Sequence, residues 1–246
     1  MSDIVHEERL LFFIPARGGS GGIHRKNLQE ILGVTLVGRC VQTCFEALKL
    51  LNTKFGQVVV STNDEEIARI GILHGAEIHW RPDELCEDSS TTEEALGHFL
   101  GLEPRFESNS TPENQRIAML QCTSPFTRAR ELVEGFESLN RGYDSAFLGV
   151  ENHYWLYSEG DDGSLRPQGH LLGHRPSRQA VKVQYHETGA AYFFRGSDFQ
   201  ASQFRLNGSM FCVSTDLFGS IDIDEPEDLV YARLVALSFD EMENPS

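Results

Sequence analysis

The chain has 246 residues, and 37 acidic against 21 basic side chains give it a formal net charge of −16. Nucleic acids and anionic membranes are bound through a basic footprint, so this charge argues against both as partners. No apolar run approaches the ~20 residues of a membrane span, and the acidic start MSDIVHEERL lacks the cationic and apolar parts of a signal peptide. Five scattered cysteines indicate free thiols in a reducing compartment. We therefore expect a cytoplasmic protein with residues 1–246 in a single domain.

The stretch LLFFIPARGGSGGIHRKNL, residues 10–28, organises the chain. Its apolar beginning, residues 10–14, predicts a buried parallel strand that ends at Pro15. Glycines and permanent cations follow, namely Arg17, Gly18, Gly19, Gly21, Gly22, Arg25 and Lys26. Such glycines are free to adopt positive φ angles and let a polyanion approach the backbone amides, and the cations indicate phosphate as that anion. The alternative is a tight surface turn with solvated basic residues.

Three known patterns can be compared with this loop. The P-loop needs Lys, and the dinucleotide-binding fingerprint needs Gly, where this chain has His24. The nucleophile elbow of serine hydrolases, G-x-S-x-G, matches residues 18–22 literally, with Ser20 as the nucleophile. An elbow follows several earlier strands, however, and only one strand fits before Ser20. We therefore interpret the loop as a phosphate-binding loop that is neither a P-loop nor a dinucleotide-binding loop.

The rest of the chain alternates apolar strand patterns with amphipathic helix patterns. We expect strands at residues 10–14, 57–61, 76–80, 116–121, 144–150, 189–195 and 208–214. We expect helices at residues 36–51, 65–73, 91 or 92 to 100, 130–139 and 226–236. Short links between these units predict an α/β fold, a mostly parallel Rossmann-like sheet flanked by helices with right-handed crossovers. His74, His79, His98 and His170 are interpreted as ordinary surface or core positions.

Two segments depart from this alternation. Residues 81–92, RPDELCEDSSTT, form a polar loop at the carboxyl end of the third strand, where open α/β sheets bind ligands. From residue 151 to residue 185 periodicity vanishes and Gly, Pro, His and Arg dominate. We interpret this second segment as an irregular inserted excursion, part flap and part dimerisation segment.

Two acidic side chains near the end of the chain form the second strong feature. In an extended segment, Asp222 and Asp224 project to one side while Ile221 and Ile223 face the core. Paired carboxylates repel, and Mg²⁺ relieves this by taking one or two protein carboxylates together with water and substrate phosphate. The alternative, acids that begin a helix at Pro226, suits the same spacing. The spacing of the two acids favours metal binding and helix capping equally.

A phosphate loop together with a distant Asp-x-Asp pair predicts metal-assisted nucleotidyl transfer. In such a reaction cations hold a triphosphate, and Mg²⁺ neutralises charge on the α-phosphate and the departing pyrophosphate. An incoming hydroxyl attacks the α-phosphorus in line, so no protein nucleophile is needed.

The motifs resemble the acylneuraminate cytidylyltransferases (CMP-sialic acid synthetases). The resembling blocks occur in order over residues 10–235: IPARGGS and RKNL in the first loop, then VSTN, RPDEL, LQCTSP, TGAAY and DIDEPEDL. The resemblance implies that CTP and a nine-carbon α-keto sugar acid give a CMP-sugar and pyrophosphate. It also implies a homodimer in which the excursion reaches into the partner's site.

The resemblance also implies roles for individual residues. Arg17 and Lys26 would bind the triphosphate, and Asp222 and Asp224 would ligate Mg²⁺; these four are the candidate catalytic residues. The candidate nucleotide-binding residues are Ala16, Arg17, Gly18, Gly19, Ser20, Lys26, Asn27, Arg81, Ser90 and Thr92. The candidate acid-binding residues are Gln121, Arg175, Arg178, Gln179 and Tyr185, and either arginine could pair with the sugar carboxylate.

The chain departs from the family pattern at four positions. Gly21 and His24 replace the usual Lys and Pro of the loop, and Cys122 and Thr188 replace Pro and Asn on the acid side. Losing one phosphate-facing cation weakens triphosphate binding unless His24 or Arg25 compensates. The acceptor is therefore open among neuraminic, legionaminic and pseudaminic types. The alternatives are another α-keto or phosphonate acid, or a nucleotide-binding protein without turnover.

Overall fold

The apolar run near the start of the chain forms the central strand of a sheet. In the computed structural model, which describes residues 9–19, 22–102, 115–168, 173 and 183–243, with side chains up to residue 238, this strand is β1 (Arg9–Pro15). The other strands are β2 (Glu30–Ile31), β3 (Val34–Thr35), β4 (Gly56–Thr62), β5 (Glu77–Trp80), β6 (Gln115–Leu120), β7 (Ser145–Asn152), β8 (Leu156–Glu159), β9 (Leu165–Gln168), β10 (Gln184–Arg195) and β11 (Met210–Ser214). The helices are α1 (Leu36–Leu51), α2 (Glu65–Leu73), α3 (Thr92–Leu102), α5 (Ala129–Asn140), α6 (Gly196–Ser202) and α7 (Pro226–Glu243), with 3₁₀ turns η1 (Lys26–Leu28) and η2 (Asp83–Leu85).

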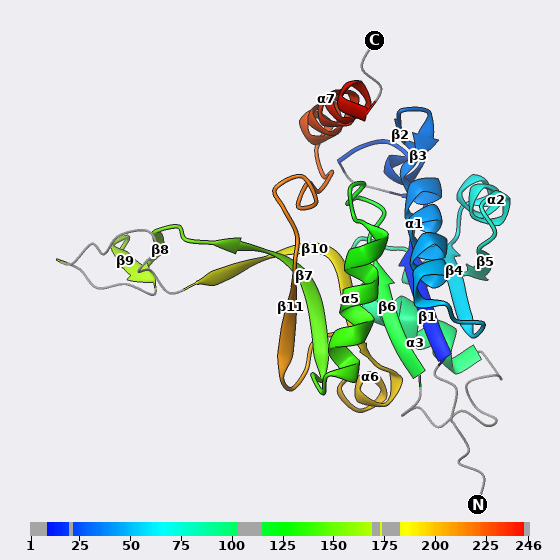
Figure 1. Ribbon diagram of the computed structural model, residues 1–246, viewed down its shortest axis with the longest axis horizontal. Coiled ribbons are helices and arrows are strands. Elements are labelled where there is room, and N and C mark those ends of the chain that lie inside the picture. Colours follow the sequence, from blue (N-terminus) through cyan, green and yellow to red (C-terminus); the bar gives the residue numbers. More distant parts are fainter. Residues whose placement is uncertain (1–8, 20–21, 103–114, 169–172, 174–182, 244–246) are drawn as a thin grey trace, which may run out of the picture.

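Seven strands form the main sheet, in the order β11-β7-β10-β6-β1-β4-β5 (Figure 1). β10 runs antiparallel to both of its neighbours, and the other pairings of this sheet are parallel. The chain builds β1, β4 and β5 toward one edge and then returns to place β6 on the other side of β1. Such a reversal opens a crevice at the carboxyl ends of the strands. The predicted α/β fold is confirmed.

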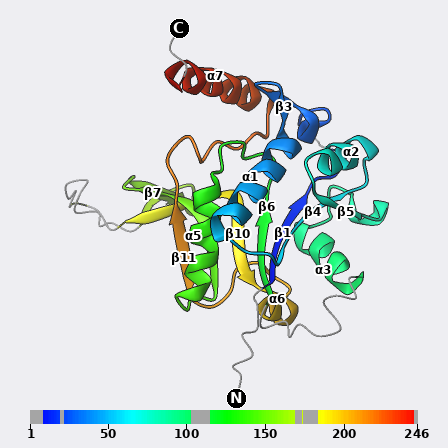
Figure 2. The ribbon, with the colours of Figure 1, turned by 45° about the vertical axis from the view of Figure 1, so that its right-hand side comes forward.

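Side chains of β1 alternate between two cores. Leu10, Phe12 and Ile14 belong to the larger core, which also contains buried residues of α1, α2, α5 and α7. Leu11 and Phe13 belong to the smaller core, which they share with α3 and α6. Because both faces of the strand are covered, its sequence is apolar from Leu10 to Ile14. The views in Figures 1 and 2 show the helices on the two sides of the sheet, with α7 lying across the carboxyl edge near β2 and β3.

The helices begin where short polar side chains cap them. Thr35 accepts a hydrogen bond from Gly38 N–H at the start of α1, and Asp64 accepts two from Glu66 and Ile67 at the start of α2. Both contacts satisfy amides that have no partner within the helix. The predicted helices 36–51 and 65–73 therefore have the bounds that the structure shows. The last helix continues to residue 243, beyond the predicted end at 236.

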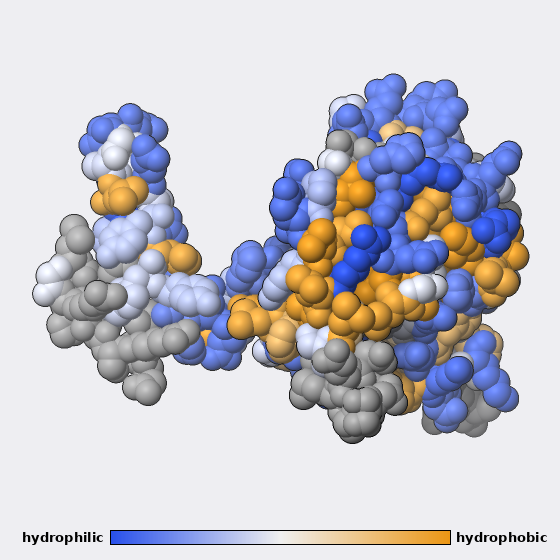
Figure 3. Space-filling model, turned by 90° about the horizontal axis from the view of Figure 1, so that it is seen from above, coloured by the Kyte–Doolittle hydropathy of each residue, from blue (hydrophilic) through white to orange (hydrophobic). Residues whose placement is uncertain are grey.

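Residues 151–185 are more regular than the sequence predicts. β7 and the first half of β10 continue as an antiparallel pair beyond the sheet, with Gln184 opposite Asn152. Beyond them β8 and β9 form a two-stranded hairpin. We call residues 151–168 and 183–187 the arm. Figures 1 and 3 show the arm extending well away from the body of the protein. The expectation of an irregular segment is wrong for this part, because pairing with β7 and within the hairpin orders the backbone.

Apolar side chains are exposed on two parts of the surface. Along the arm they are Tyr154, Leu156, Tyr157, Leu165, Val183 and Tyr185, and on α7 they are Val230, Tyr231, Leu234 and Leu237. Figure 3, viewed from the α7 end, shows apolar surface on the body and on the separate lobe of the arm. Within the described residues, no helix combines the length and the apolar character that crossing a membrane requires.

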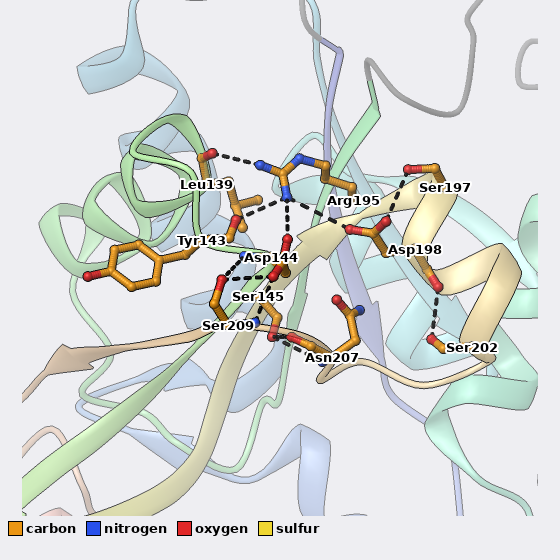
Figure 4. A network of polar contacts seen from close by, with 10 residues as sticks. All are labelled: Leu139, Tyr143, Asp144, Ser145, Arg195, Ser197, Asp198, Ser202, Asn207 and Ser209. Carbon is orange, nitrogen blue, oxygen red and sulfur yellow. Dashed lines mark hydrogen bonds and ion pairs between the residues drawn. The ribbon is translucent and has the colours of Figure 1, made fainter.

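A polar network around Arg195 lies at the amino ends of the parallel strands, at the end of the sheet away from their carboxyl ends (Figure 4). The guanidinium donates to Leu139 O at 2.8 Å and to Tyr143 O at 3.0 Å. It also lies 3.9 Å from the carboxylate of Asp144 and 3.8 Å from that of Asp198. One side chain thus joins the end of β10 to the turn after α5 and to the start of α6, a short helix that the sequence analysis does not predict.

Candidate functional site

The first loop and the last acidic segment meet at the carboxyl edge of the sheet. Lys26 Nζ lies 2.9 Å from Asp224 Oδ1, although the two residues are 198 positions apart in the chain. The Lys26 side chain is 15% exposed and that of Asp224 is 70% exposed, so the pair lies at the surface of the crevice. The convergence of basic loop and acidic pair, expected from the sequence, is present.

The acidic segment is held against the loop that follows β6. Ile223 N–H donates to Thr123 O at 2.9 Å, and Ser124 Oγ lies 3.4 Å from Asp222 Oδ1. Ile221 and Ile223 are buried while Asp222 is half-buried and Asp224 is exposed, as the alternation predicts. Burial raises the pKa of the Asp222 carboxyl, and the negative charge of Asp224 raises it further, whereas the charge of Lys26 lowers it. Two close carboxylates of this kind favour a cation beside them.

These two carboxylates suit Mg²⁺. Magnesium prefers oxygen ligands and takes one or two protein carboxylates, leaving other positions for water and substrate phosphate. Within the described residues, no group of three or more His, Cys, Asp or Glu is arranged to hold a metal ion by itself. A site of two acids fits a metal that arrives with its phosphate ligand. The position of the Lys26 ammonium shows that a cation is accommodated beside Asp224.

Gly18 and Gly22 of the loop are required for space. A Cβ atom added at Gly22 would lie 2.4 Å from Asp224 O, and one at Gly18 would lie 2.9 Å from the Cβ of Asp64. At Gly19 a Cβ would meet nothing within 4 Å. The three glycines of this loop that the structure describes do not have positive φ, so that part of the expectation is wrong. Gly22 lets the loop approach the acidic segment directly.

Positive φ occurs instead at Arg25, with φ 51°. Its guanidinium lies 2.9 Å from Glu66 Oε2 and 3.4 Å from Asp64 Oδ2, at the N-terminus of α2. These pairs turn Arg25 toward α2, while Lys26 lies against Asp224. Arg25 therefore anchors the loop and does not take the place of the missing loop lysine.

Arg17 is directed toward the loop that follows β5. It donates from Nη1 to Cys86 O at 3.0 Å and pairs through Nη2 with Asp88 at 2.6 Å. Asn27 Nδ2 donates to Arg17 O at 3.0 Å, so its amide group supports the loop backbone. Ala16 is fully buried, and its N–H donates to Ser61 O.

The loop after β5 carries three more predicted nucleotide-binding residues. Arg81 is 7% exposed and is bonded to Ser61. Ser90 Oγ donates to Glu84 O at 3.1 Å, and Thr92 Oγ1 donates to Glu93 Oε2 at 3.0 Å at the start of α3. All three lie on elements that follow β5 at the carboxyl edge.

Sequence reasoning missed two residues that support this side of the site. Asn63 accepts from Gly18 N–H at 3.0 Å and donates to Asp83 at 3.2 Å, which joins the first loop to the loop after β5. Ser61, at the end of β4, contacts Arg81. Their position directly after a buried apolar strand was the available signal, because such positions face the crevice.

The acid side of the crevice is only partly described. Gln121 begins the loop after β6, with its N–H bonded to Ala190 O at 3.0 Å. Cys122 is buried, and Thr188 donates its hydroxyl to Leu148 O at 2.9 Å. Neither replacement therefore presents a free polar group. Tyr185 is half-exposed on the arm. The predicted residues Ser20, Arg175, Arg178 and Gln179 lie outside the described residues.

Curated proteins provide the first comparison. N-acylneuraminate cytidylyltransferase A of Danio rerio is 34% identical over 184 residues, which cover 73% of this chain and 40% of that protein. The pseudaminic acid cytidylyltransferase of Campylobacter jejuni subsp. jejuni serotype O:23/36 is 25% identical over 237 residues and covers 92% of this chain and 95% of that protein. The chain spans about half the length of the N-acylneuraminate relatives it matches.

Solved structures support the fold. CMP:2-keto-3-deoxy-manno-octonic acid synthetase, solved in complex with CTP, has a TM-score of 0.64 at 14% identity and covers 94% of this chain and 100% of that chain. A 4-diphosphocytidyl-2C-methyl-D-erythritol synthase from Anaerococcus prevotii has a TM-score of 0.62, also at 14% identity, and covers 94% of this chain and 99% of that chain. The family model described as cytidylyltransferase matches residues 11–219, which include the glycine loop, the loops after β4, β5 and β6, and the arm. With the motifs of the first loop, the loop after β6 and the acidic segment all at one edge of such a sheet, the chain belongs to the cytidylyltransferase family.

Proposed function

We propose that this protein transfers CMP from CTP to a sialic-acid-like nonulosonic acid, releasing pyrophosphate, with Mg²⁺ bound by Asp222 and Asp224. The observation that carries the proposal is the contact of Lys26 with Asp224 at 2.9 Å. This contact supports the proposal, because a cation that bound phosphate and acids that bound a metal would then both be within reach of one triphosphate. A passive nucleotide-binding protein needs the cation but has no use for the paired acids.

Different residues of the site bind the nucleotide and orient the metal-binding carboxylates. Arg17 and Lys26 hold negative charge of the triphosphate, and Arg81 binds the cytidine. When bound, Mg²⁺ supplies Lewis-acid stabilisation of charge on the phosphate oxygens. Thr123 and Ser124 keep the acidic segment beside the loop after β6, so the carboxylates are oriented before substrate binds. Catalysis then depends on positioning and electrostatics, without a covalent intermediate on the protein.

The acceptor proposal follows from the relatives and from the acid side of the crevice. Relatives named for neuraminic and pseudaminic acids match most of this chain. We propose that Gln121 contacts the sugar acid and that Arg175 or Arg178 pairs with its carboxylate. Because Cys122 is buried and the Thr188 hydroxyl is bonded to the backbone, these two positions shape the pocket without adding a polar contact.

We further propose a homodimer formed through the arm, in the cytoplasm. An isolated two-stranded hairpin is at best marginally stable in water, and this one carries exposed apolar side chains that a second copy would cover. All five cysteines lie within the described residues as free thiols, which suits a reducing compartment.

The test is an acceptor screen. The protein is incubated with CTP, Mg²⁺ and a panel of neuraminic, legionaminic, pseudaminic, octulosonic and phosphonate acids, and pyrophosphate and CMP conjugates are measured by mass spectrometry. We expect a CMP conjugate with a nonulosonic acid. Folded protein that binds CTP but yields no conjugate with any acid would support the binding protein without turnover.

The variant Asp222→Asn further distinguishes a cytidylyltransferase from a nucleotide-binding protein without turnover. We expect it to lower kcat by at least 100-fold while CTP binding without metal changes little, because the substitution removes a metal ligand and leaves Lys26, Arg17 and Arg81 in place. Glu46→Gln, which removes an exposed charge on α1, is the matched control and should leave kcat unchanged. A turnover rate in Asp222→Asn equal to that of the control would contradict the metal assignment.

A further inference from the structure

Two histidines without a role in the proposed site form a continuous hydrogen-bonded chain with Arg81. His98 Nδ1 lies 2.9 Å from His79 Nε2, and His79 Nδ1 lies 2.9 Å from Ser61 Oγ. Ser61 Oγ in turn accepts from Arg81 Nε at 3.1 Å. This hydrogen-bonded chain runs from His98 on α3, through β5 and β4, to the loop that begins at Arg81. It therefore connects three elements beneath the nucleoside side of the site.

The direction of these hydrogen bonds is fixed by their chemistry. An arginine Nε–H can only donate, so Ser61 Oγ is the acceptor in its contact with Arg81. Ser61 is fully buried, and its hydroxyl proton therefore needs an acceptor, which His79 Nδ1 provides. His79 then carries its proton on Nε2 and donates it to His98 Nδ1. Each group in the chain donates to the next, and the arrangement requires a neutral His79.

The surroundings of His79 keep it neutral. The residue is 7% exposed, and its ring contacts Phe99 at a centroid distance of 5.3 Å and Phe13 at 6.4 Å. Burial lowers the pKa of His79 to about 4, and the neighbouring His98 and Arg81 act in the same direction. A protonated His79 would present a donor to Ser61 and remove the acceptor for its hydroxyl.

Ser61 also fixes the other side of the Arg81 guanidinium. Arg81 Nη2 donates to Ser61 O at 2.9 Å, and the Arg81 backbone N–H donates to Thr62 O at 2.9 Å. One serine thus binds two nitrogens of the guanidinium, through its hydroxyl and its carbonyl. Nη1 is the nitrogen of the group that is not bound to Ser61. Arg17 lies close enough to add to the lowering of the Arg81 pKa that burial causes.

We propose that His79 and His98, acting through Ser61, are positioning residues that hold the Arg81 guanidinium ready for the base of a pyrimidine nucleotide. The inference rests on the proposed function, in which Arg81 binds the cytidine. A rigid donor group distinguishes bases by the pattern of their acceptors, and buried polar groups discriminate strongly when they are left unpaired by the wrong ligand. The histidine chain therefore contributes to affinity for CTP and to its preference over UTP.

The test compares His79→Phe with His79→Asn. Phenylalanine keeps the ring packing but removes both hydrogen bonds, whereas the Asn Oδ1 can replace Nδ1 as the acceptor for Ser61. We expect His79→Phe to raise the KM for CTP about tenfold and to reduce the CTP over UTP preference, with kcat at saturating CTP within twofold and the acceptor KM unchanged. His79→Asn should restore most of the CTP affinity.

Controls separate positioning from general damage. His74→Asn changes a half-buried histidine at the end of α2, beside Gly38 of α1, and it should leave the KM for CTP unchanged. In an Arg81→Lys background, which already lacks the Nε–H contact, His79→Phe should add no further effect. If His79→Phe fails to fold, His98→Leu, at a half-buried position, should raise the KM for CTP in the same direction by about threefold. A folded His79→Phe with an unchanged CTP KM, or with equal rises for CTP and acceptor, overturns the proposal.

A measurement that does not depend on enzymatic turnover tests this inference separately from the proposed function. Nitrogen-15 NMR of the histidine rings at pH 7 should show His79 unprotonated at Nδ1 and protonated at Nε2. The Arg81 Nε–H should exchange slowly with solvent in the wild type and faster in His79→Phe. A wild-type protein that gives these signals but no CMP conjugate refutes the proposed function and leaves the hydrogen-bonded chain intact. A proton on His79 Nδ1 refutes the chain, whatever the activity.

Discussion

At the scale of single residues, Gly22 is the position of the first loop where one added methyl group would meet backbone. A Cβ there would lie 2.4 Å from Asp224 O, which is backbone and cannot rotate away. We expect Gly22→Ala to lower the free energy of unfolding by about 1–3 kcal/mol and to reduce kcat, because the first loop must move away from the acidic segment. Urea denaturation and steady-state kinetics measure the two effects.

Gly19→Ala is the matched control for stability, since its Cβ would meet nothing within 4 Å. Its free energy of unfolding should stay within about 0.5 kcal/mol of the wild type. Equal stability of the two alanine variants would show that the loop does not press against Asp224.

His79 predicts a dependence of stability on pH. Its pKa is lowered from 6.5 to about 4 in the folded protein, so the unfolded chain takes up the proton first as the pH falls. The stability that the neutral ring contributes is complete above pH 6.5 and decreases between pH 6.5 and 4, by about 3 kcal/mol at most. We expect His79→Phe to lack this part of the pH dependence. Urea titrations of both proteins at pH 7.5, 5.5 and 4.5 measure it, and parallel curves would contradict it.

Some residue roles could be predicted from the sequence and others could not. The alternation of Ile221, Asp222, Ile223 and Asp224 predicts which side chains face out, because an extended backbone has period two. The convergence of the basic loop with the acidic pair was expected from the two motifs together, but the pairing of Lys26 with Asp224 in particular depends on strand order, which no local pattern encodes. The contacts of His79 and Ser61 were not predicted, because they join side chains from different elements of the fold.

At the scale of elements, Arg195 joins β10, α5 and α6 at the edge away from the site (Figure 4). Without its guanidinium, the carbonyls of Leu139 and Tyr143 lose their charged donor. We expect Arg195→Met to lower the free energy of unfolding by about 2–3 kcal/mol and to leave the KM for CTP unchanged. Urea denaturation and kinetics test both parts.

Arg69→Met provides the comparison, because Arg69 is two-thirds exposed and lies 3.9 Å from Glu66 on the surface of α2. An exposed pair of this kind contributes less than about 1 kcal/mol. If the two methionine variants lose equal stability, Arg195 does not hold these elements together.

The helices were easier to predict than the arm. The bounds of α1 and α2 follow from capping residues and a period of 3.6, both of which are local properties. In residues 156–168 the β8–β9 pair lacks an alternating apolar pattern, because an arm that leaves the body has no buried face to encode one. The short helix α6 was missed for a related reason, since few of its residues are buried against the core.

At the scale of the whole molecule, the exposed apolar residues of the arm predict how two copies associate. We expect the wild type to sediment as a dimer and Leu165→Glu to shift it toward monomer, because the new charge would be desolvated in the interface. Leu73→Glu, at a similarly exposed leucine on α2, should remain dimeric. Sedimentation velocity over a range of protein concentrations measures this. A monomeric wild type, or a dimer unaffected by Leu165→Glu, would contradict the proposed interface.

The strand order is the part of the fold that the sequence could not provide. Alternating strands and helices predict a mostly parallel sheet, but the placement of β10 between β6 and β7, antiparallel to both, depends on long-range pairing. That placement brings the start of β10 and the end of β7 to the same edge as the site. The arm therefore leaves the body beside the crevice.

The distance along the chain between Lys26 and Asp224 has a consequence for how the protein is made. A ribosome adds roughly 5–20 residues per second, so about 10–40 seconds separate the synthesis of the two members of the pair. During that interval the growing chain carries the glycine loop without its acidic counterpart. Translation that stops before residue 222 therefore yields a polypeptide that has the basic loop and lacks both carboxylates of the acidic pair.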